Sequence, residues 1–527
     1  MHFRIYLIIA AILLLSGCHS VSKLANEIES ATQKTEENRQ LKQANPNVII
    51  IVADQMRRAS MGFWQQEKFR GALNGRSDYV VTPNLDKLAN EGIVFTEAIS
   101  NYPLCSPFRG MLMSGMFPHN NGVTNNTRID RPTVGLRPDI TSLTEVLNQA
   151  GYNTALVGKG HWHNNLPLFD NHSRYVGTTV APGGHFMKGT KYDTFIPPGP
   201  GRQGIEYWYQ TLGHNHDSPM VYTNDTKRSG VPEGHPYFPK RYSAVDQADV
   251  IIDYLNNTHQ QRQVDKPFSI LWTMDPPHSP YQAMEDTDEA IYNQYYKDLP
   301  IETLLNRPNV NIERAKKYAR IYFSMVTIVD REIGRILDEL KSLGLDENTL
   351  IVFTSDHGEM MGSHSKMTKN VFYEESLAIP LIIHQPQKLK PQIQDLLIGV
   401  PDFMPTILGL LDLEDKIPDS LDGLDYSPLL LNKKLGIERL PKSSLYYGAG
   451  SKYGVKTHKY TYVVSGNGEL AALFNNLNDP YQLTPLNFAD IPTQDVNFLK
   501  QQLGYWLKKT NHDWFKARKY PSMIAYP

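Results

Sequence analysis

The sequence lacks the features that mark several specialised classes of protein. Its formal net charge is only −2, which argues against broad binding of nucleic acids or other polyanions through charge alone. It contains two cysteines, and we find no internal repeat and no low-complexity block in its main part. What is present is a chain of 527 residues, with 40% hydrophobic and 20% charged residues, as in an ordinary globular protein. This length allows a large domain and a smaller one.

The N-terminal apolar run is the only candidate for a membrane-directed segment. Residues 5–15 are too few to cross a bilayer comfortably, but they have the length of a signal-peptide core, and Arg4 precedes them. The run ends in Leu-Ser-Gly-Cys18, which resembles a bacterial lipobox. We therefore expect a signal peptide over 1–17, lipidation of Cys18 (a palmitate-type acyl anchor) and a polar tether over 18–45. A plain secretory signal is the alternative.

The predicted anchor determines where we expect the protein. Acyl chains on Cys18 would attach it to a bacterial membrane, with the outer membrane preferred. Residues 19–22 lack the acidic cluster that some bacterial lipoproteins carry for surface export, which favours the periplasmic side.

Cys105 has no partner left if Cys18 is lipidated. An exported protein with one remaining cysteine cannot form an internal disulfide, so this thiol is expected to be reactive or intermolecular. The alternative for an isolated cysteine is a small buried packing residue. The neighbours Ser106, Pro107 and Arg109 favour a chemical role.

Buried strand patterns alternate with helix patterns along the chain. Strands are expected over 47–53, 93–95, 152–157, 268–274 and 350–354, and helices over 82–92, 140–151, 245–255 and 322–343. This alternation predicts an α/β fold with a large, mostly parallel sheet between two layers of helices.

The pattern changes after about residue 400. A helix is expected from 402, followed by short strand-like pieces near 445–447, 460–464 and 470–474 and a final helix over 496–508. The sequence therefore predicts a main domain over 46–430 and a smaller α+β subdomain over 431–527.

Polar residues follow four of the predicted strands. Asp54, Lys159, His278 and Asp356 each lie just past a strand's carboxyl end. Ligands bind at that edge in open α/β sheets, so these side chains are expected to converge there. Each also has a plainer explanation. Asp54 and Asp356 could cap helices, Lys159 could be a solvated charge, and His278 could be a turn residue.

Three ordered motifs carry a family resemblance. Cys105 to Arg109 fits the pattern C-x-P-x-R and continues as Gly-Met-Leu-Met-Ser-Gly-Met-Phe-Pro-His119. Gly158-Lys-Gly-His161-Trp-His163 and Ser355-Asp-His-Gly-Glu359, with Lys369 beyond, follow in order. Over about residues 46–480 the chain resembles the type I, formylglycine-dependent sulfatases of the alkaline-phosphatase-like superfamily, and in particular bacterial lipoprotein members that act on polysaccharides such as ulvan.

The resemblance implies a mechanism and a site. Cys105 would be oxidised to Cα-formylglycine (3-oxoalanine) by a maturation enzyme, and the hydrated aldehyde would attack sulfur and then eliminate sulfate. A hard divalent cation would assist, with Ca²⁺ expected and Mg²⁺ the alternative. The implied catalytic residues are Cys105, Arg109, Lys159, His161, His278 and Lys369, and the implied metal ligands are Asp54, Gln55, Cys105, Asp356 and His357. Gln55 and His357 depart from the Asp and Asn of many relatives, which makes the identity of the metal less certain.

The expected substrate is a sulfated carbohydrate, either a polysaccharide or its oligosaccharides, with ulvan favoured and carrageenan possible. Residues 203–242 concentrate aromatic and basic side chains that could bind a sugar. Our candidates there are Tyr207, Trp208, His214, Arg228 and Arg241. An ordinary surface insertion is an equally good interpretation of this segment. Two other functions stay open, namely a phosphomonoester, phosphodiester or phosphonate hydrolase of the same superfamily and an inactive carbohydrate-binding lipoprotein.

Overall fold

The computed structural model describes residues 45–128, 131, 133–164, 195–433, 440–448 and 451–513. The predicted signal peptide, the lipidation site Cys18 and nearly all of the tether lie outside these residues. A compact unit begins at Pro46. Within the described ranges, no helix is long and apolar enough to cross a membrane.

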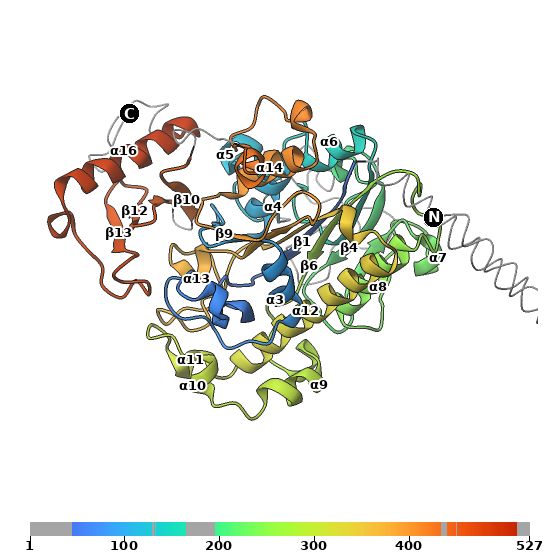
Figure 1. Ribbon diagram of the computed structural model, residues 1–527, viewed down its shortest axis with the longest axis horizontal. Helices are drawn as coiled ribbons and strands as arrows, with labels where there is room; N and C mark the ends of the chain where they lie inside the picture. The colour runs from blue at the N-terminus through green and yellow to red at the C-terminus, as the bar shows by residue number, and fades with distance from the viewer. Residues whose placement is uncertain are drawn as a thin grey trace, which may run out of the picture. The chain divides into compact units, whose positions relative to one another are not determined.

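A nine-stranded sheet forms the centre of this unit (Figure 1). Its strand order is β5-β4-β3-β6-β1-β7-β8-β2-β9, and five of its eight pairings are parallel. The strands are β1 (Asn47–Ala53), β2 (Ile93–Phe95), β3 (Asn153–Lys159), β4 (Tyr207–Leu212), β5 (Met220–Thr223), β6 (Phe268–Met274), β7 (Thr349–Ser355), β8 (Leu381–His384) and β9 (Gln392–Gln394). The predicted mostly parallel α/β sheet is confirmed.

Helices cover both faces of the sheet. The described α-helices are α3 (Pro83–Glu91), α4 (Cys105–Ser114), α5 (Pro118–Asn121), α6 (Leu143–Gln149), α7 (Thr226–Ser229), α8 (Ser243–Leu255), α9 (Glu289–Ile291), α10 (Ile301–Leu304), α11 (Ile312–Ala315), α12 (Ala319–Ser342), α13 (Glu374–Leu377), α14 (Phe403–Leu410), α15 (Ser427–Leu430) and α16 (Thr493–Lys509). In Figure 1, α8 and α12 lie on one side of the sheet, and α4 and α14 lie on the other.

The central strand explains this layering. Every residue of β1 is buried, and alternate side chains enter different cores. Val48, Ile50 and Val52 pack with residues of α4, α6 and α14. Ile49 and Ile51 pack with residues of α3, α8 and α12. A continuous run of apolar residues therefore fits here, because neither face of the strand meets water.

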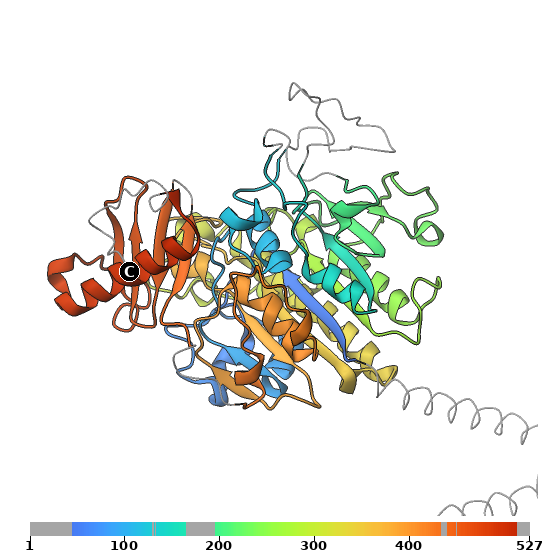
Figure 2. The ribbon, with the colours of Figure 1, turned by 90° about the horizontal axis from the view of Figure 1, so that it is seen from above.

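A second, four-stranded sheet lies near the C-terminus and is drawn in orange-red with α16 in Figure 2. It is antiparallel and consists of β10 (Ser444–Gly448), β11 (Lys452–Lys456), β12 (Tyr460–Val464) and β13 (Leu470–Asn475). Leu445 and Tyr447 of β10 share a hydrophobic cluster with Leu430 of α15. The core therefore continues across the boundary that we predicted at residue 430.

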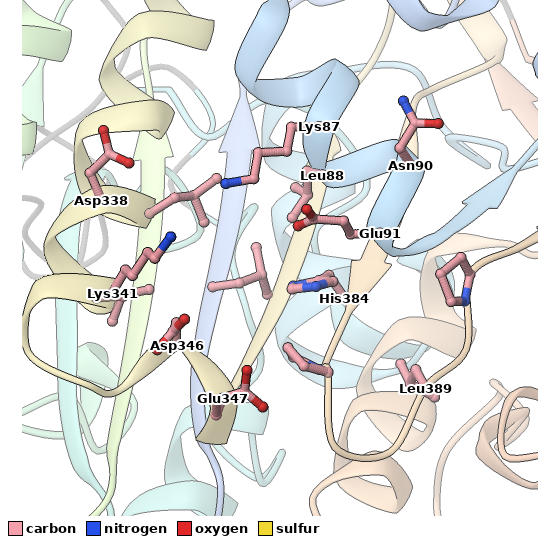
Figure 3. Close-up of a pocket in the computed structure, with 15 residues that line it drawn as sticks. Lys87, Leu88, Asn90, Glu91, Asp338, Lys341, Asp346, Glu347, His384 and Leu389 are labelled. Carbon is pink, nitrogen blue, oxygen red and sulfur yellow. The ribbon is translucent and has the colours of Figure 1, made fainter.

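A pocket of about 530 Å³ opens at the amino end of β7 (Figure 3). Charged side chains of α3, of the end of α12 and of the turn before β7 line it, together with His384 of β8. None of the candidate residues from the sequence lies in this pocket. The catalytic and metal-ligand candidates gather at the opposite end of the sheet.

Candidate active site

Two adjacent parallel strands place two carboxylates side by side. In the register of β1 and β7, Ala53 lies beside Ser355, so the residues that follow each strand are also neighbours. The Asp356 amide donates to the carbonyl of Ala53 over 3.3 Å, which holds the two strand ends together. Asp54 and Asp356 are both fully buried at this edge.

Strand β3 brings a basic group to the same edge. Lys159 ends β3 and is fully buried, and its Nζ lies 2.7 Å from Oδ2 of Asp54. Gly158, directly before it, has φ +109°, and a Cβ there would stand 2.0 Å from the carbonyl oxygen of Thr273 in β6. Only glycine allows β3 and β6 to approach so closely beneath the site.

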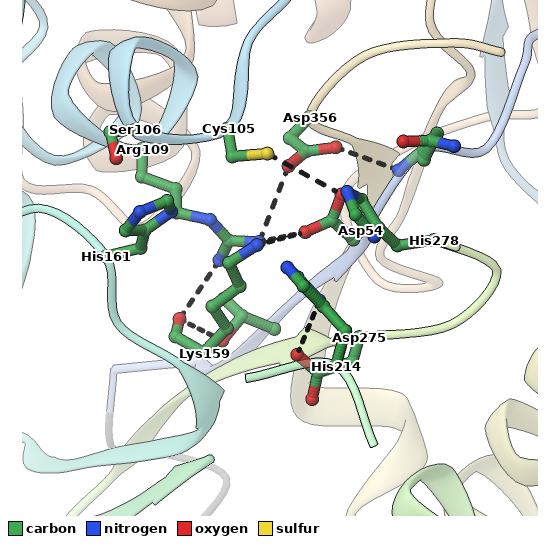
Figure 4. A network of polar contacts seen from close by, with 12 residues as sticks. Asp54, Cys105, Ser106, Arg109, Lys159, His161, His214, Asp275, His278 and Asp356 are labelled. Atoms are coloured by element: carbon green, nitrogen blue, oxygen red, sulfur yellow. Dashed lines mark hydrogen bonds and ion pairs between the residues drawn. The ribbon is translucent and has the colours of Figure 1, made fainter. Parts of the chain in front are cut away.

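Helix α4 supplies Cys105 and Arg109. Cys105 is the first residue of the helix, and Arg109 lies one turn later, so both side chains project from the same face. The Arg109 guanidinium donates to the Lys159 carbonyl over 3.0 Å and lies 3.3 Å from Asp54 and 3.5 Å from Asp356. Figure 4 shows this network, with Cys105 pointing toward the two aspartates.

Four residues form a group of possible metal ligands. One ligand atom from each of Asp54, Cys105, Asp356 and His357 lies within 4.8 Å of the others. The Cys105 sulfur is 3.4 Å from Nε2 of His357 and 4.0 Å from Oδ1 of Asp54. Two carboxylates and one imidazole are a donor set that fits a divalent cation.

Burial and charge push the two carboxyl groups in opposite directions. Burial opposes the charge of Asp54, but neighbouring positive charges, Lys159 foremost, outweigh it and hold its pKa well below the usual range. Burial and the neighbouring Asp54 raise the pKa of Asp356 to about 6. A cation between the two would favour the charged form of both.

Gln55 takes a different position from the other predicted ligands. Its amide donates to Glu359 over 2.5 Å, and its Oε1 accepts from Nζ of Lys369 over 2.6 Å. Its backbone N–H donates to Oδ1 of Asp356 over 3.0 Å, and its φ of 67° is left-handed. Such backbone strain is often found at functional sites. The structure thus joins Gln55 to Lys369 and Glu359 as well as to the metal-ligand group.

His278 and Lys369 form the other side of the site. Nε2 of His278 shares a hydrogen bond with Nζ of Lys369. His214 stacks on the His278 ring, with centroids 4.0 Å apart, and its Nδ1 lies 4.0 Å from Asp275. Burial and the nearby positive charge of Lys369 hold the pKa of His278 well below its usual range. His278 is therefore neutral at pH 7 in this environment.

His161 also adopts a left-handed backbone, with φ 61°. Its Nε2 lies 3.3 Å from the carbonyl oxygen of Thr127, and among the described residues its buried Nδ1 has no partner. Burial, together with Lys159 and Arg109, holds its pKa well below the usual range. His161 is thus a neutral imidazole with one nitrogen available to a bound molecule.

The structure corrects the sugar-binding prediction for the aromatic residues of 203–242. Tyr207 and Trp208 belong to β4, an inner strand of the large sheet, and are 4% and 0% exposed. Their rings face the two hydrophobic cores, so the prediction that they stack on a sugar is wrong. The aromatic clustering that suggested a binding loop is core packing.

The two arginines of the same segment are committed to α8. Arg228 pairs with Asp253 at 2.7 Å and Asp246 at 3.3 Å, and Arg241 pairs with Asp249 at 2.7 Å. These ion pairs leave no structural reason to assign either arginine to substrate. His214 is the one candidate from this segment that the structure places beside the site.

Two buried acids of the site were not predicted from the sequence. Asp275 directly follows β6, as Asp54 follows β1, and accepts from Thr211 over 2.8 Å. The same strand-end signal could have identified it. Glu359 accepts from the Met361 and Thr368 amides, each over 2.7 Å, and thereby fixes the loop that carries Lys369. No sequence pattern indicated this role of Glu359.

Comparisons with known proteins identify the family. The family model described as "Sulfatase" matches residues 46–413, and "N-sulphoglucosamine sulphohydrolase, C-terminal" matches residues 362–509. The chain belongs to the sulfatase family. It is therefore an enzyme that hydrolyses sulfuric esters, and the buried group at the carboxyl edge of its sheet lies where the family's motifs converge.

Relatives of this sulfatase cover nearly its whole length. An "Endo-4-O-sulfatase" of Bacteroides thetaiotaomicron is 38% identical over 506 residues, which are 92% of this chain and 96% of the relative. An "Ulvan-active sulfatase" of Formosa agariphila is 30% identical, over 90% and 83% of the two chains. A solved structure from work on glycosaminoglycan metabolism by Bacteroides thetaiotaomicron has a TM-score of 0.83 and 37% identity, over 92% of this chain and 100% of that one.

Proposed function

We propose that the sulfatase removes sulfate from a sulfated polysaccharide or its oligosaccharides, with Cys105, oxidised to formylglycine, as the nucleophile. The observation that carries this proposal is the position of Cys105. Cys105 is the first residue of α4, and its sulfur lies within 4.8 Å of ligand atoms from Asp54, Asp356 and His357. A helix N-terminus also favours negative charge on a reacting oxygen at this position.

A divalent cation fits among the same residues. Asp54, Asp356 and His357 would hold it, and the sulfur of Cys105 stands in for an oxygen of the oxidised residue. We propose Ca²⁺, because two carboxylates provide hard oxygen ligands, with Mg²⁺ as the alternative. Such an ion, when bound, would lower the pKa of the nucleophile and stabilise charge on a sulfate ester.

The basic residues have separable tasks in this proposal. Arg109 donates to the two aspartates and to the carbonyl at the end of β3, and so holds in place the groups that surround the nucleophile. Lys159 stabilises negative charge beside Asp54. Nδ1 of His161, which has no partner among the described residues, would accept a proton from the nucleophile, and the hydrogen-bonded pair of His278 and Lys369 would deliver one to the leaving alcohol.

The relatives support a glycan substrate for the enzyme. The relative that is 38% identical is named for 4-O-sulfate removal within chains, and the one that is 30% identical is named for activity on ulvan. We place glycosaminoglycans with 4-O-sulfate first and ulvan second, following the order of similarity of these relatives and of the solved structure from work on glycosaminoglycan metabolism. This order revises the preference for ulvan that the sequence motifs had suggested.

We also propose that Cys18 is lipidated and holds the enzyme at a bacterial membrane, on the periplasmic side. The proposal rests on the apolar run and the Leu-Ser-Gly-Cys sequence alone. Metabolic labelling with a fatty acid would mark the wild type and not a Cys18→Ser variant. Unlabelled wild-type protein would reject it.

The test of the catalytic proposal is sulfate release from defined substrates. The panel holds chondroitin 4-sulfate oligosaccharides, ulvan oligosaccharides, p-nitrophenyl sulfate and p-nitrophenyl phosphate, each with wild type and Cys105→Ala. We expect sulfate from at least one glycan, a preference for aryl sulfate over aryl phosphate, and no release by Cys105→Ala. A preference for phosphate, or activity that survives the substitution, would reject the proposal.

A further inference from the structure

A second pocket lies beside the site, against the C-terminal sheet. Its volume is about 450 Å³, within the range of small-ligand sites. Its described lining includes three tyrosines, one arginine and two asparagines, and none of its described residues is acidic. These six residues are Tyr102, Tyr447, Tyr453, Arg131, Asn125 and Asn370.

Two residues of the pocket lining, Asn370 and Asn125, connect the pocket to segments of the active site. Asn370 follows Lys369, whose Nζ contacts Gln55 and His278 in the site. The side chain of Asn126 accepts from the amide of Ser106, the residue after Cys105, over 3.0 Å. Asn125 lines the pocket directly before Asn126, so a molecule at Cys105 could extend into this space.

Arg131 gives the pocket its charge. Its Nη1 donates to Oδ1 of Asn125 over 2.7 Å and to the carbonyl of Asn126 over 3.3 Å. No carboxylate in the described part of the chain pairs with Arg131, in contrast to Arg228 and Arg241. These two hydrogen bonds fix the guanidinium and leave its other N–H groups for an anionic ligand.

Aromatic rings form another part of the lining. Tyr102 and Tyr447 are stacked with centroids 6.5 Å apart, and Tyr453 meets Tyr447 edge-on at 6.0 Å. Tyr102 and Tyr447 are buried, whereas Tyr453 is partly exposed. Rigid tyrosines offer an apolar face with a polar rim, which suits the face of a sugar ring.

We propose that this pocket binds a negatively charged sugar next to the sugar that loses its sulfate, with Arg131 holding the charge. The assignment rests on the proposed glycan substrate and makes it more specific. A single cation with amide groups and no described acid selects a carboxylate or a second sulfate over a neutral sugar. The enzyme would then discriminate among glycans by the charge of the neighbouring unit.

The test compares Arg131→Gln with wild type on matched substrates. These are a chondroitin 4-sulfate tetrasaccharide, the same tetrasaccharide with its carboxyls reduced to alcohols, a carboxyl-reduced form with a second sulfate, and p-nitrophenyl sulfate. Arg70→Gln is the matched control, because Arg70 is 75% exposed and pairs only with Glu67 in the described structure. Arg131→Lys tests whether a positive charge suffices without the forked donor groups of the guanidinium.

We expect Arg131→Gln to lower kcat/KM for the charged tetrasaccharide, relative to p-nitrophenyl sulfate, by roughly 10- to 100-fold, mainly through KM. The kcat/KM for the carboxyl-reduced tetrasaccharide, relative to that for p-nitrophenyl sulfate, should not change. Arg131→Lys should recover part of the loss on the charged tetrasaccharide. Loss only with the carboxylate form identifies a uronate as ligand, and loss only with the disulfated form identifies sulfate.

Two results would overturn the proposal. One is an unchanged ratio in Arg131→Gln, and the other is an equal loss on p-nitrophenyl sulfate, which would show a structural role. If the wild type cleaves p-nitrophenyl sulfate but releases sulfate from no glycan, the glycan function fails and the pocket assignment fails with it. If glycans are cleaved and Arg131→Gln matches wild type, only the pocket assignment fails.

Discussion

The two ends of the large sheet carry similar residue types in opposite environments. At the carboxyl end, Asp54, Asp356 and Lys159 are 0% exposed, and Arg109 is 2% exposed. At the amino end, the pocket of Figure 3 is also lined by acidic and basic side chains. Five of these are exposed, namely Lys87, Glu91, Asp338, Lys341 and Glu347.

The difference shows which charges carry chemistry. A solvated charge costs little to keep and contributes little, whereas a buried charge is costly unless other groups compensate it. The carboxyl end keeps a thiol, two acids and two bases in one buried group, where the pKa values of Asp54 and Asp356 depend on the neighbours. The larger pocket at the amino end has no such group, and its size alone does not indicate function.

The largest effect is expected for the nucleophile. Cys105→Ala removes the thiol that is to be oxidised to the nucleophile, so sulfate release should fall by roughly 10⁴-fold or more. The measurement is kcat/KM on p-nitrophenyl sulfate. Cys105→Ser, which keeps a hydroxyl, serves as the control and should also be inactive. Activity near the wild-type value in either variant would contradict the account.

Removal of divalent cations should also abolish activity. Without a cation, Asp54 and Asp356 face each other in a buried site, so Tm should fall as well, by an amount equivalent to roughly 3 kcal/mol for a tightly bound ion. Calorimetry and sulfate release, before and after treatment with a chelator and then with added Ca²⁺, measure both effects. Asp54→Asn should respond much less. An identical Tm with and without chelator would contradict the presence of the ion.

A buried ion pair outside the active site should affect stability instead of chemistry. Glu374 contacts Lys456 of β11 at 2.5 Å and Arg58 at 2.7 Å. It therefore links the C-terminal sheet to the segment that follows β1 of the large sheet. Glu374→Gln removes one of the two acids near these nearly buried cations, leaving Glu97 at 2.9 Å from Lys456 and 3.9 Å from Arg58, and should lower the free energy of unfolding by about 3 kcal/mol at pH 7. Urea unfolding measures it.

The same pair predicts a pH dependence with a definite sign. Burial opposes the charge of Glu374, but Lys456 and Arg58 outweigh it and lower its pKa to about 2 from an ordinary 4.5. A carboxyl group whose pKa is lower in the folded protein stabilises the fold at pH values above its pKa in the unfolded chain. This contribution is lost as the pH falls. The difference in free energy of unfolding between wild type and Glu374→Gln should therefore become smaller below about pH 4.5. A constant difference would contradict the assignment.

Two histidines at the two ends of the sheet allow a matched comparison. His214→Asn removes the ring that stacks on His278 and should lower kcat/KM by up to about tenfold. His384→Asn, in the amino-end pocket, should leave kcat/KM unchanged. Equal effects of the two substitutions would show that stacking on His278 has no role.

The smallest effects are expected at the exposed charges of the amino end. Lys341→Gln and Glu347→Gln should each change the free energy of unfolding by less than about 0.5 kcal/mol, since both side chains are solvated. Sulfate release should stay at the wild-type value. A loss of activity in either variant would show that this pocket is coupled to the site.

The sequence predicted the parts of the fold that depend on local pattern. Buried runs such as 47–53 and 349–355 form strands because they are apolar on both faces, and the polar residue after each run marks the carboxyl edge. The ordered motifs brought Cys105, Lys159 and Asp356 into one hypothesis. These features require no knowledge of distant contacts.

What the sequence did not predict depends on packing between distant segments. The aromatic residues of 207–212 resembled a binding loop, because nothing local shows that β4 is covered on both faces. The stacking of His214 on His278 and the contact of Glu359 with Gln55 join residues far apart in the chain. The pocket at Arg131 also requires the C-terminal sheet, whose strand β11 the sequence pattern missed.

The most direct test of the account is the chemical state of residue 105 in active enzyme. Mass spectrometry of the peptide that contains Cys105, from protein that releases sulfate from p-nitrophenyl sulfate, distinguishes an aldehyde from a thiol. The account predicts the aldehyde, at a fraction that rises with specific activity across preparations. An unmodified thiol in fully active enzyme would contradict it.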